Sequence, residues 1–461
     1  MTTLSVAVVG SGPAGLYTAE ALVKQAAALD PPCQVAVDVL DRLPTPYGLV
    51  RYGVAPDHPS IKSIAEYLRG VLEHPGVAFI GGVRLGGEVT REDLLSCYDA
   101  VVYATGAMRD RRMGIDGEDL PGSYAATDFV NWYCGHPDTD AGSFTLDAES
   151  VAVIGVGNVA VDVARILVRD PEELRRTDVS QPVLQALAAS KVREVHVIGR
   201  RGPAQAKFTT KELRELGELA GVDIVVGAGE ADPAAFDATG GGAAAADRRV
   251  RGNLAVIGDW AARVPAGNPR RLVLRFWLRP VRVEGTGRVS GLTVERTRID
   301  GNGVLTGTGE LEHIPAQMVL RSVGYQSVPL PGVPFDQRSC TVPNAEGRVL
   351  GDDGAPLPRE YVAGWLKRGP TGVIGTNKSD AAQTVRSLLA DLCPGGGPAG
   401  QGARAGALAA LLAGRSVQPV SYADWLKVER AEAELAASLG RGARVKLASR
   451  AEIDACCRGG S

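Results

Sequence analysis

The sequence predicts an α/β fold in which two doubly wound units each carry a parallel sheet, the second unit being inserted into the first. Two segments have the pattern of a buried strand, a glycine turn and a helix, one over residues 6–15 and the other over 151–160. A third apolar strand, residues 360–365, leads into another glycine turn at 369–377 and a helix from Ser379. This late repetition of the pattern predicts that the chain returns to the first unit after completing the second.

Length and composition are those of a globular protein. The 461 residues allow two or three domains at about 150 residues each, and 45% of them are apolar and 22% charged. A net charge of −3 gives no reason to expect nucleic acid or an anionic membrane as a partner. No apolar run reaches the roughly 18 residues of a membrane span. A strand begins near the N-terminus without a basic leader before it, so we expect a cytoplasmic protein.

Cysteine spacing argues against a metal or dithiol centre. The seven cysteines are Cys33, Cys97, Cys134, Cys340, Cys393, Cys456 and Cys457. They include no Cys-x-x-Cys pair and no cluster with the spacing of a zinc or iron–sulfur site. We therefore expect no bound metal and no dithiol redox centre.

Further elements follow from short apolar runs. Helices are expected at residues 16–29 and 161–168, directly after the two glycine turns. Continuous apolar runs predict buried strands at residues 35–40, 100–104, 195–198, 224–226 and 319–323. Antiparallel strands are expected at residues 271–283 and 289–297.

Domain boundaries follow from this order of elements. We expect the first domain to consist of residues 1–106 and 329–461, the latter with a C-terminal extension, and the inserted domain to be residues 107–328. Two stretches of low complexity, 231–246 and 394–406, are expected to be surface loops or linkers.

Both glycine turns have the spacing Gly-x-Gly-x-x-Gly or Ala. The first contains Gly10, Gly12 and Gly15, and the second runs from Gly155 to Ala160. Glycine at these positions permits a tight turn and lets the backbone approach a pyrophosphate, which then faces the N-terminus of the following helix. One such turn is weak as a signal, but two in the context of strand, turn and helix predict two Rossmann-like dinucleotide sites.

The residue after the second strand of each domain distinguishes the nucleotides. Asp41 ends that strand in the first domain, and a carboxylate there accepts hydrogen bonds from ribose hydroxyls and repels a 2′-phosphate. In the inserted domain Arg200 and Arg201 follow the strand, where two guanidinium groups can bind a 2′-phosphate. The alternative interpretation of the arginine pair is a solvated charged surface. We expect FAD or NAD in the first domain and NADP in the inserted one.

FAD and NADP in one chain predict hydride transfer between a nicotinamide and a flavin. Disulfide reductases need paired cysteines near the flavin, and iron–sulfur subunits need clustered ones; the sequence has neither. The expected electron acceptor is therefore a substrate, oxygen or a separate redox protein.

Four long segments resemble the adrenodoxin-reductase type of ferredoxin–NADP+ reductase. They are LPTPYGLVRYGVAPDHP (43–59), GVGNVAVDVAR (155–165), GRRGPAQAKFTTKELRE (199–215) and GWLKRGPTGVIGTNK (364–378). The resemblance covers nearly the whole chain, including residues 444–449. The chain departs from the family in its low-complexity stretches and in Asp41, where Glu is common; both residue types keep the carboxylate.

The resemblance implies a set of site residues. Besides the glycines of the first turn, the positions that match the family's FAD contacts are Ala14, Asp41, Leu49, Val83, Trp365, Gly372, Val373 and Ile374. Those that match its NADP contacts are Val156, Gly157, Asn158, Val159, Arg200, Arg201, Glu212 and Gly372. His58 and Glu215 match the polar pair near the nicotinamide and the flavin.

Four of these residues have a plainer alternative. Gly372 would begin a helix whose N–H groups face the flavin N1–C2=O edge, which becomes negative on reduction, or it is a simple turn glycine. Trp365 would hold the flavin ring or is a core aromatic. His58 would position or protonate a group beside the flavin or belongs to a polar turn, and Glu215 has the alternative of a solvated helix residue. Because the cofactors carry the hydride chemistry, we expect no indispensable catalytic side chain.

The predicted function is transfer of a hydride from NADPH to FAD and then of single electrons to a ferredoxin, such as one that serves a cytochrome P450. The alternatives are a flavoprotein that reduces a small molecule, a quinone or oxygen, and a non-catalytic module that senses NADP. Because ferredoxins are usually acidic, we expect them to dock on a basic patch within residues 191–215, together with Arg263, Arg270 and Arg271. An unrelated solvated surface is the alternative for this patch.

Overall fold

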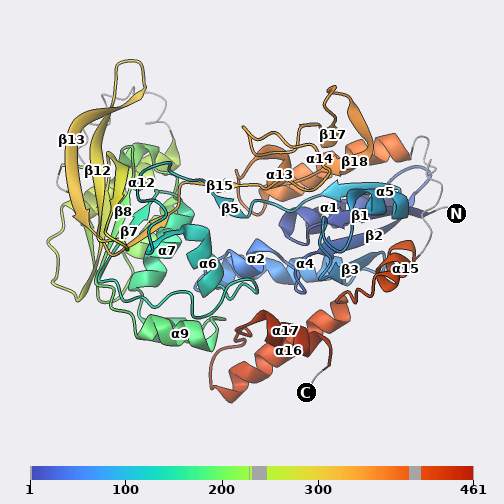
Figure 1. Cartoon of the computed structure of the whole chain (residues 1–461), viewed down its shortest axis with the longest axis horizontal. Helices are drawn as coiled ribbons and strands as arrows, with labels where there is room; N and C mark the ends of the chain where they lie inside the picture. The colour runs from blue at the N-terminus through green and yellow to red at the C-terminus, as the bar shows by residue number, and fades with distance from the viewer. Residues whose placement is uncertain (1–2, 228, 231–246, 394–405, 460–461) are drawn as a thin grey trace. The chain divides into compact units, whose positions relative to one another are not determined.

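The chain folds into two compact units (Figure 1). A computed structural model describes residues 3–227, 229–230, 247–393 and 406–459. Unit 1 comprises Met1–Arg109 with Tyr325–Ser461, and unit 2 comprises Asp110–Gly324. The boundaries predicted from the sequence lie three residues before the first of these junctions and four residues after the second. The predicted loops at 231–246 and 394–406 lie outside the described residues, except for Gly406, which is the N-cap of the helix Ala407–Gly414.

Unit 1 is built on a seven-stranded sheet with the order β16-β17-β18-β4-β1-β2-β3. The strands are β1 (Thr3–Val9), β2 (Gln34–Asp41), β3 (Val77–Gly81), β4 (Ala100–Tyr103), β16 (Asn344–Ala345), β17 (Arg348–Leu350) and β18 (Pro356–Val362). The five strands from β18 to β3 are parallel. Pairing of β18 with β4 confirms the predicted return of the chain to the first sheet.

Apolar side chains cover both faces of this sheet. Val6 and Val8 belong to a core cluster with the helices α1 (Pro13–Ala27) and α14 (Thr376–Leu392). Ala7 and Val9 point to the other face, where a second cluster packs them against different elements. The other helices of unit 1 are α2 (Leu49–Tyr52), α3 (Pro59–Lys62), α4 (Ile64–Leu72), α5 (Arg91–Cys97), α13 (Trp365–Arg368), α15 (Ala407–Gly414), α16 (Tyr422–Ser438) and α17 (Arg450–Cys457). Burial on both faces explains why these strands are continuous apolar runs.

Unit 2 contains a six-stranded parallel sheet with the order β6-β14-β7-β8-β10-β9. Its strands are β6 (Ser123–Ala125), β7 (Ser150–Ile154), β8 (Glu194–Ile198), β9 (Val222–Val226), β10 (Arg270–Arg275) and β14 (Met318–Arg321). Its helices are α6 (Ala126–Tyr133), α7 (Asn158–Val168), α8 (Pro171–Leu174), α9 (Gln181–Ala188), the 3₁₀ turn η1 (Pro203–Gln205), α10 (Thr210–Leu216) and α12 (Arg248–Ala261). The short strands β5 (Arg109–Asp110) and β15 (Tyr325–Gln326) lie where the chain passes between the units.

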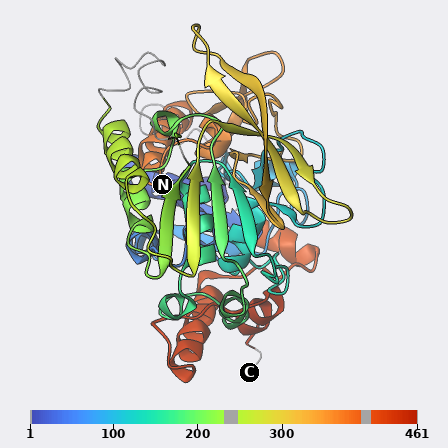
Figure 2. The same cartoon turned by 90° about the vertical axis from the view of Figure 1, so that its left-hand side faces the viewer.

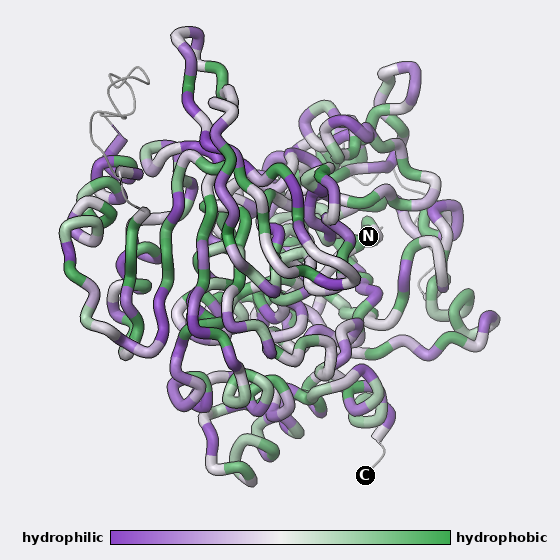
Figure 3. Tube along the Cα trace, turned by 60° about the vertical axis from the view of Figure 1, so that its left-hand side comes forward, coloured by the Kyte–Doolittle hydropathy of each residue, from purple (hydrophilic) through white to green (hydrophobic). Residues whose placement is uncertain are grey.

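A second, three-stranded antiparallel sheet belongs to unit 2. It consists of β11 (Leu278–Glu284), β12 (Gly291–Ile299) and β13 (Leu305–Pro315). Figure 2 shows its long yellow strands beside the parallel strands, and Figure 3 shows hydrophobic and hydrophilic residues interspersed along the trace of the chain.

One sequence prediction is wrong here. We expected a single antiparallel strand at residues 271–283, but β10 pairs in parallel with β8 and β9, and only β11 is antiparallel. The extended conformation is interrupted between the two strands at Trp277, whose φ of 61° is incompatible with a strand. The antiparallel strand predicted at 289–297 is confirmed by β12.

No helix in the described ranges combines the length and the apolar composition that crossing a membrane requires. No group of three or more His, Cys, Asp and Glu side chains in these ranges is arranged to hold a metal ion.

Candidate functional site

The first glycine turn joins β1 to α1. Gly10 has a φ of 114°, and a Cβ there would lie 2.6 Å from the carbonyl oxygen of Ala104. A Cβ at Gly15 would overlap the carbonyl oxygen of Gly10, so only glycine lets the first turn of α1 pack this closely. Ala14 is buried at the same place. The turn therefore brings the backbone of the helix N-terminus against the sheet edge.

The N-terminus of α1 has no side-chain cap, and the same is true of α7 in unit 2. Other helices, such as α14, also lack a side-chain cap, but α14 does not follow a turn with this glycine spacing. By contrast, α5, α10, α16 and α17 each begin with a capping box in which a side chain accepts from the backbone. The first N–H groups of a helix lack partners within the helix, so uncapped groups are available to an anion. Both glycine turns therefore fit the pyrophosphate of a dinucleotide.

Asp41 is fixed against the first glycine turn. Its Oδ2 accepts hydrogen bonds from the backbone N of Ser11, at 2.9 Å, and from Ser11 Oγ, at 2.6 Å. Its Oδ1 accepts from the backbone N of Leu43 at 2.9 Å. Each carboxylate oxygen has two lone pairs, and Oδ1 accepts only one bond here, so this acid can also accept a ribose hydroxyl.

Leu49 and Val83 lie near the same turn. Leu49 is half-buried and begins α2, whose N-cap residue Gly48 comes close to Gly12. The side chain of Val83 is buried in an apolar cluster, and its backbone N–H donates to the carbonyl of Asp41 at 2.9 Å. A contact between Val83 and a cofactor would therefore involve the backbone.

A buried ion pair attaches the segment 43–59, which follows β2, to helix α16. Arg51 bonds Glu432 of α16 with both terminal nitrogens, and its guanidinium group lies over the ring of Trp425. Burial alone would lower the pKa of Arg51, but the charge of Glu432 raises it, so the guanidinium group stays protonated. Lys446 Nζ donates to the Arg51 carbonyl at 2.7 Å. This contact joins two of the segments that carry the family resemblance, 43–59 and 444–449.

The C-terminal glycine turn is correctly placed but wrongly described by the sequence prediction. Helix α14 begins at Thr376, whereas Gly372 has a φ of 82° and precedes it in a turn. A left-handed residue cannot continue an α-helix, so Gly372 does not start one. The backbone N of Val373 donates to Thr376 Oγ1 at 3.2 Å. Val373 is 66% exposed and Ile374 half-buried, so this turn presents apolar surface.

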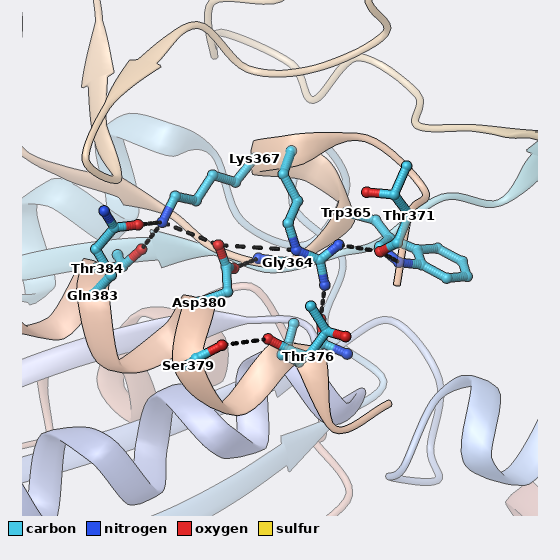
Figure 4. A network of polar contacts seen from close by, with 12 residues as sticks. Gly364, Trp365, Lys367, Thr371, Thr376, Ser379, Asp380, Gln383 and Thr384 are labelled. Carbon is cyan, nitrogen blue, oxygen red and sulfur yellow. Dashed lines mark hydrogen bonds and ion pairs between the residues drawn. The ribbon is translucent and has the colours of Figure 1, made fainter. Parts of the chain in front are cut away.

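A network of hydrogen bonds and ion pairs surrounds the turn at 369–375 (Figure 4). The Arg368 guanidinium donates to the Thr371 carbonyl at 2.5 Å and to Asn377 Oδ1 at 2.8 Å. Asp380 accepts from the backbone N of Gly364 at 2.6 Å and forms an ion pair with Lys367 at 3.1 Å. The turn between α13 and α14 is thus held at both ends by charged side chains.

Trp365 is placed differently from a simple core residue, whereas His58 is buried in a turn. Trp365 is half-buried; its Nε1 donates to the Thr371 carbonyl at 3.2 Å, and its ring lies 5.6 Å from that of Tyr325. The alternative of a core aromatic therefore does not describe it. His58 is buried at the N-cap of α3, where its carbonyl accepts from the backbone N of Ile61.

The second glycine turn joins β7 to α7 in unit 2. Gly155 has a φ of 135°, and a Cβ there would overlap the carbonyl of Ser322. The carbonyl of Val156 accepts from the backbone N of Lys207 at 2.8 Å. Gly157 is the N-cap of α7, and Val159 is half-buried in its first turn. The turn is therefore tied to the loop that precedes α10.

Thr209 connects two predicted NADP contacts. Its backbone N donates to Asn158 Oδ1 at 3.0 Å, and its Oγ1 bonds Glu212 Oε2 at 2.8 Å. Glu212 thereby completes the capping box of α10. The structure thus brings Asn158 and Glu212 together through a residue that sequence reasoning missed, although the spacing Thr-x-x-Glu is a recognisable capping signal.

Arg200 and Arg201 are exposed on the loop after β8. Glu215 is half-buried on α10, with Lys211 Nζ at 3.9 Å from its carboxylate. His58 belongs to unit 1 and Glu215 to unit 2, so their expected meeting beside the cofactors stays a prediction.

Two cysteines that lie far apart in the sequence are neighbours in unit 1. The sulfur atoms of Cys33 and Cys393 are 3.1 Å apart, and both residues are buried. Burial raises the pKa of the Cys393 thiol to about 12, so the thiolate that reacts with oxidants is scarce. Cysteine spacing in the sequence gave no signal of this contact.

Comparison with known proteins gives concordant matches. Residues 4–232 match the pyridine nucleotide-disulphide oxidoreductase family. The chain is 46% identical to NADPH-ferredoxin reductase FprA of Mycobacterium tuberculosis, over 97% of this chain and 98% of the relative. It is 40% identical to a mitochondrial NADPH:adrenodoxin oxidoreductase of Arabidopsis thaliana, over 94% and 91%. The structure of Mycobacterium tuberculosis FprA in complex with NADPH superimposes with a TM-score of 0.91 at 45% identity, covering 99% of this chain and 100% of that one.

Proposed function

The chain belongs to the NADPH–ferredoxin reductases of the adrenodoxin-reductase type, and we propose on this basis that it transfers electrons from NADPH through FAD to a ferredoxin. The observation that carries the proposal is a contrast between its two uncapped glycine turns. The first faces a carboxylate, Asp41, and the second is followed by the exposed pair Arg200 and Arg201. One chain thus offers one site for an unphosphorylated ribose and one for a 2′-phosphate.

FAD is assigned to unit 1. The backbone N–H groups at the start of α1 bind its pyrophosphate, and Asp41 accepts from the adenosine ribose. The turn at Gly372–Ile374 and the ring of Trp365 provide the surface for the isoalloxazine, since Val373 leaves apolar area exposed there. The bound flavin supplies a two-electron acceptor that can give up its electrons one at a time.

NADPH is assigned to unit 2. The start of α7 binds the pyrophosphate, and Arg200 with Arg201 binds the 2′-phosphate by charge-assisted hydrogen bonds. Asn158 and Glu212 keep the neighbouring loop in place through Thr209. His58 and Glu215 adjust the orientation of the reacting rings and the protons near them, and they change the rate without being indispensable.

Ferredoxin docking is assigned to a basic patch on unit 2, defined by the exposed residues Lys207, Lys211 and Arg214. Two arginines that the sequence added to it are already engaged. Arg270 donates to the carbonyls of Val168 and Arg169, and Arg271 forms an ion pair with Glu194. Lys211 is also paired, with Glu215 at 3.9 Å, but its side chain is 71% exposed and stays accessible. The patch therefore rests on the lysines and Arg214, with the exposed Arg263 that the sequence analysis added. The cytoplasmic location stays a prediction.

Three measurements on one preparation test the proposed function. The purified protein should show a flavin absorbance spectrum, and NADPH should bleach it in an anaerobic stopped-flow experiment. Reduction of cytochrome c should then rise strongly when a ferredoxin is added. Flavin reduction without any effect of ferredoxin would instead support a reductase of small molecules or oxygen. Binding of NADP without any flavin reduction would support a sensing module.

A further inference from the structure

The loop that carries Arg200 and Arg201 is held by its backbone. Three successive carbonyl oxygens of the loop accept hydrogen bonds from the segment 277–297. Gly199 accepts from the backbone N of Leu278 at 3.0 Å. Arg200 accepts from Thr297 Oγ1 at 2.8 Å, and Arg201 accepts from the backbone N of Trp277 at 3.2 Å. The backbone on both sides of the two arginines is therefore held by hydrogen bonds to the segment 277–297.

Trp277 has an unusual conformation at this contact. Its φ of 61° lies in the left-handed region, which a bulky residue adopts only when its surroundings impose it. The residue is buried, and a Cβ added to Gly202 would overlap its ring. The ring therefore packs directly against the end of the arginine loop.

Thr297 supplies the only side-chain hydroxyl among these three contacts. It is 4% exposed, and its backbone N donates to the carbonyl of Trp277 at 2.8 Å. The pairing of β12 with β13 shifts register between Glu295 and Thr297. Such irregularities re-aim side chains and occur often beside functional sites. Here the register shift lies directly before Thr297, and the Thr297 hydroxyl donates to the loop that carries Arg200 and Arg201.

We propose that Thr297 and Trp277 are positioning residues that set the preference for a 2′-phosphorylated nucleotide. This inference rests on the proposed binding of the 2′-phosphate by Arg200 and Arg201. Arginine side chains are long and flexible, so two of them converge on one phosphate at low cost only if their backbone is fixed. In this arrangement the antiparallel sheet β11–β12–β13 acts as a support for the phosphate loop.

The test compares two probes that differ only in the 2′-phosphate. Adenosine 2′,5′-bisphosphate and adenosine 5′-monophosphate are titrated by calorimetry into the FAD-loaded full chain and into Thr297→Val. Valine keeps the shape of threonine and loses the hydroxyl. A typical hydrogen bond contributes about 1 kcal/mol, so the bisphosphate should bind roughly fivefold more weakly. Binding of the monophosphate should not change.

Three further variants separate positioning from general damage. Thr297→Ser restores the hydroxyl and should restore the affinity for the bisphosphate. Thr308→Val is the matched control, because Thr308 Oγ1 also donates to a backbone carbonyl in this sheet, that of Arg296 at 3.0 Å. It should leave both affinities unchanged. Circular dichroism and thermal melting check that each variant is folded, and Gly202→Ala, which pushes on the Trp277 ring, should also weaken the bisphosphate selectively.

The outcomes distinguish this inference from the proposed function. Equal weakening of both probes by Thr297→Val, or no weakening, would overturn the positioning role. The paired variant Arg200→Ala/Arg201→Ala is titrated in parallel. If that variant still prefers the bisphosphate, the proposed phosphate site is wrong and the inference falls with it. If it loses the preference while Thr297→Val keeps it, only the inference is wrong.

Discussion

Replacing Arg200 and Arg201 together by alanine isolates the recognition of the 2′-phosphate from the rest of the nucleotide site. Both side chains are exposed, and within the described residues neither guanidinium group bonds to the protein. The substitutions therefore remove no internal side-chain contact. Exposed substitutions of this kind change stability by less than about 0.5 kcal/mol, so Tm should stay within about 2 °C.

The expected loss of NADPH affinity follows from the number and exposure of these contacts. A hydrogen bond to a charged group contributes about 1.5–3 kcal/mol. Because solvent and salt screen exposed charges, the contribution of each arginine should lie near or below the lower end of this range. Together they should contribute about 2–4 kcal/mol, or roughly 30- to 900-fold in Kd. NADH lacks the 2′-phosphate, so its binding should be nearly unaffected.

The assay is steady-state reduction of ferricyanide with NADPH or NADH as the donor. The paired variant should raise KM for NADPH strongly while kcat and the NADH parameters stay close to those of the parent. Arg298→Ala, another exposed arginine of unit 2, serves as the control and should change neither donor. Equal losses with NADPH and NADH would refute the reasoning, because the arginines would then not distinguish the phosphate.

The remaining predictions concern the flavin, the polar pair and the partner. The purified protein should be yellow and release about one FAD per chain on denaturation, measured by absorbance; a colourless protein that FAD cannot reconstitute contradicts the assignment. His58→Ala or Glu215→Ala should slow stopped-flow flavin reduction without abolishing it, and complete loss in a folded, FAD-bound variant would reveal a direct chemical role. Charge reversal of Lys207, Lys211 and Arg214 should weaken ferredoxin-dependent turnover, increasingly at low salt, with flavin reduction by NADPH nearly intact. Unchanged ferredoxin kinetics would place docking elsewhere.

The fold could be predicted where both faces of a strand are buried. The run at 151–154 is apolar throughout because β7 lies inside a parallel sheet, and the return strand at 360–362 has the same cause. The prediction failed at β10, where arginines flank the short apolar run of residues 272–274 and make the segment resemble a half-exposed strand. Its polar Arg275 is instead covered by Glu230 and Glu312, which take the place of water. A charged residue that is buried by pairing with other charges cannot be recognised from the hydrophobic pattern of the sequence.

Missed strands have a related explanation. β13 is exposed over most of its length and contains few apolar residues, so nothing in its composition marks it as a strand. It is held by backbone pairing with β12, a partner whose register only the folded chain defines. Edge strands of this kind are specified by their neighbours more than by their own side chains.

The candidate site divides in the same way. The glycines of both turns and Asp41 could be predicted because local geometry fixes their spacing. Residues that hold those groups in place could not, because their partners are distant in the chain. Thr297 contacts Arg200 across 97 residues, whereas Thr308, in the same sheet, donates to a carbonyl that plays no part in the proposed site. In the sequence the two threonines are equivalent. The fold distinguishes them by burying Thr297 and directing its hydroxyl at Arg200, whereas Thr308 is exposed. The specificity of this site must therefore be tested at residues that no motif contains.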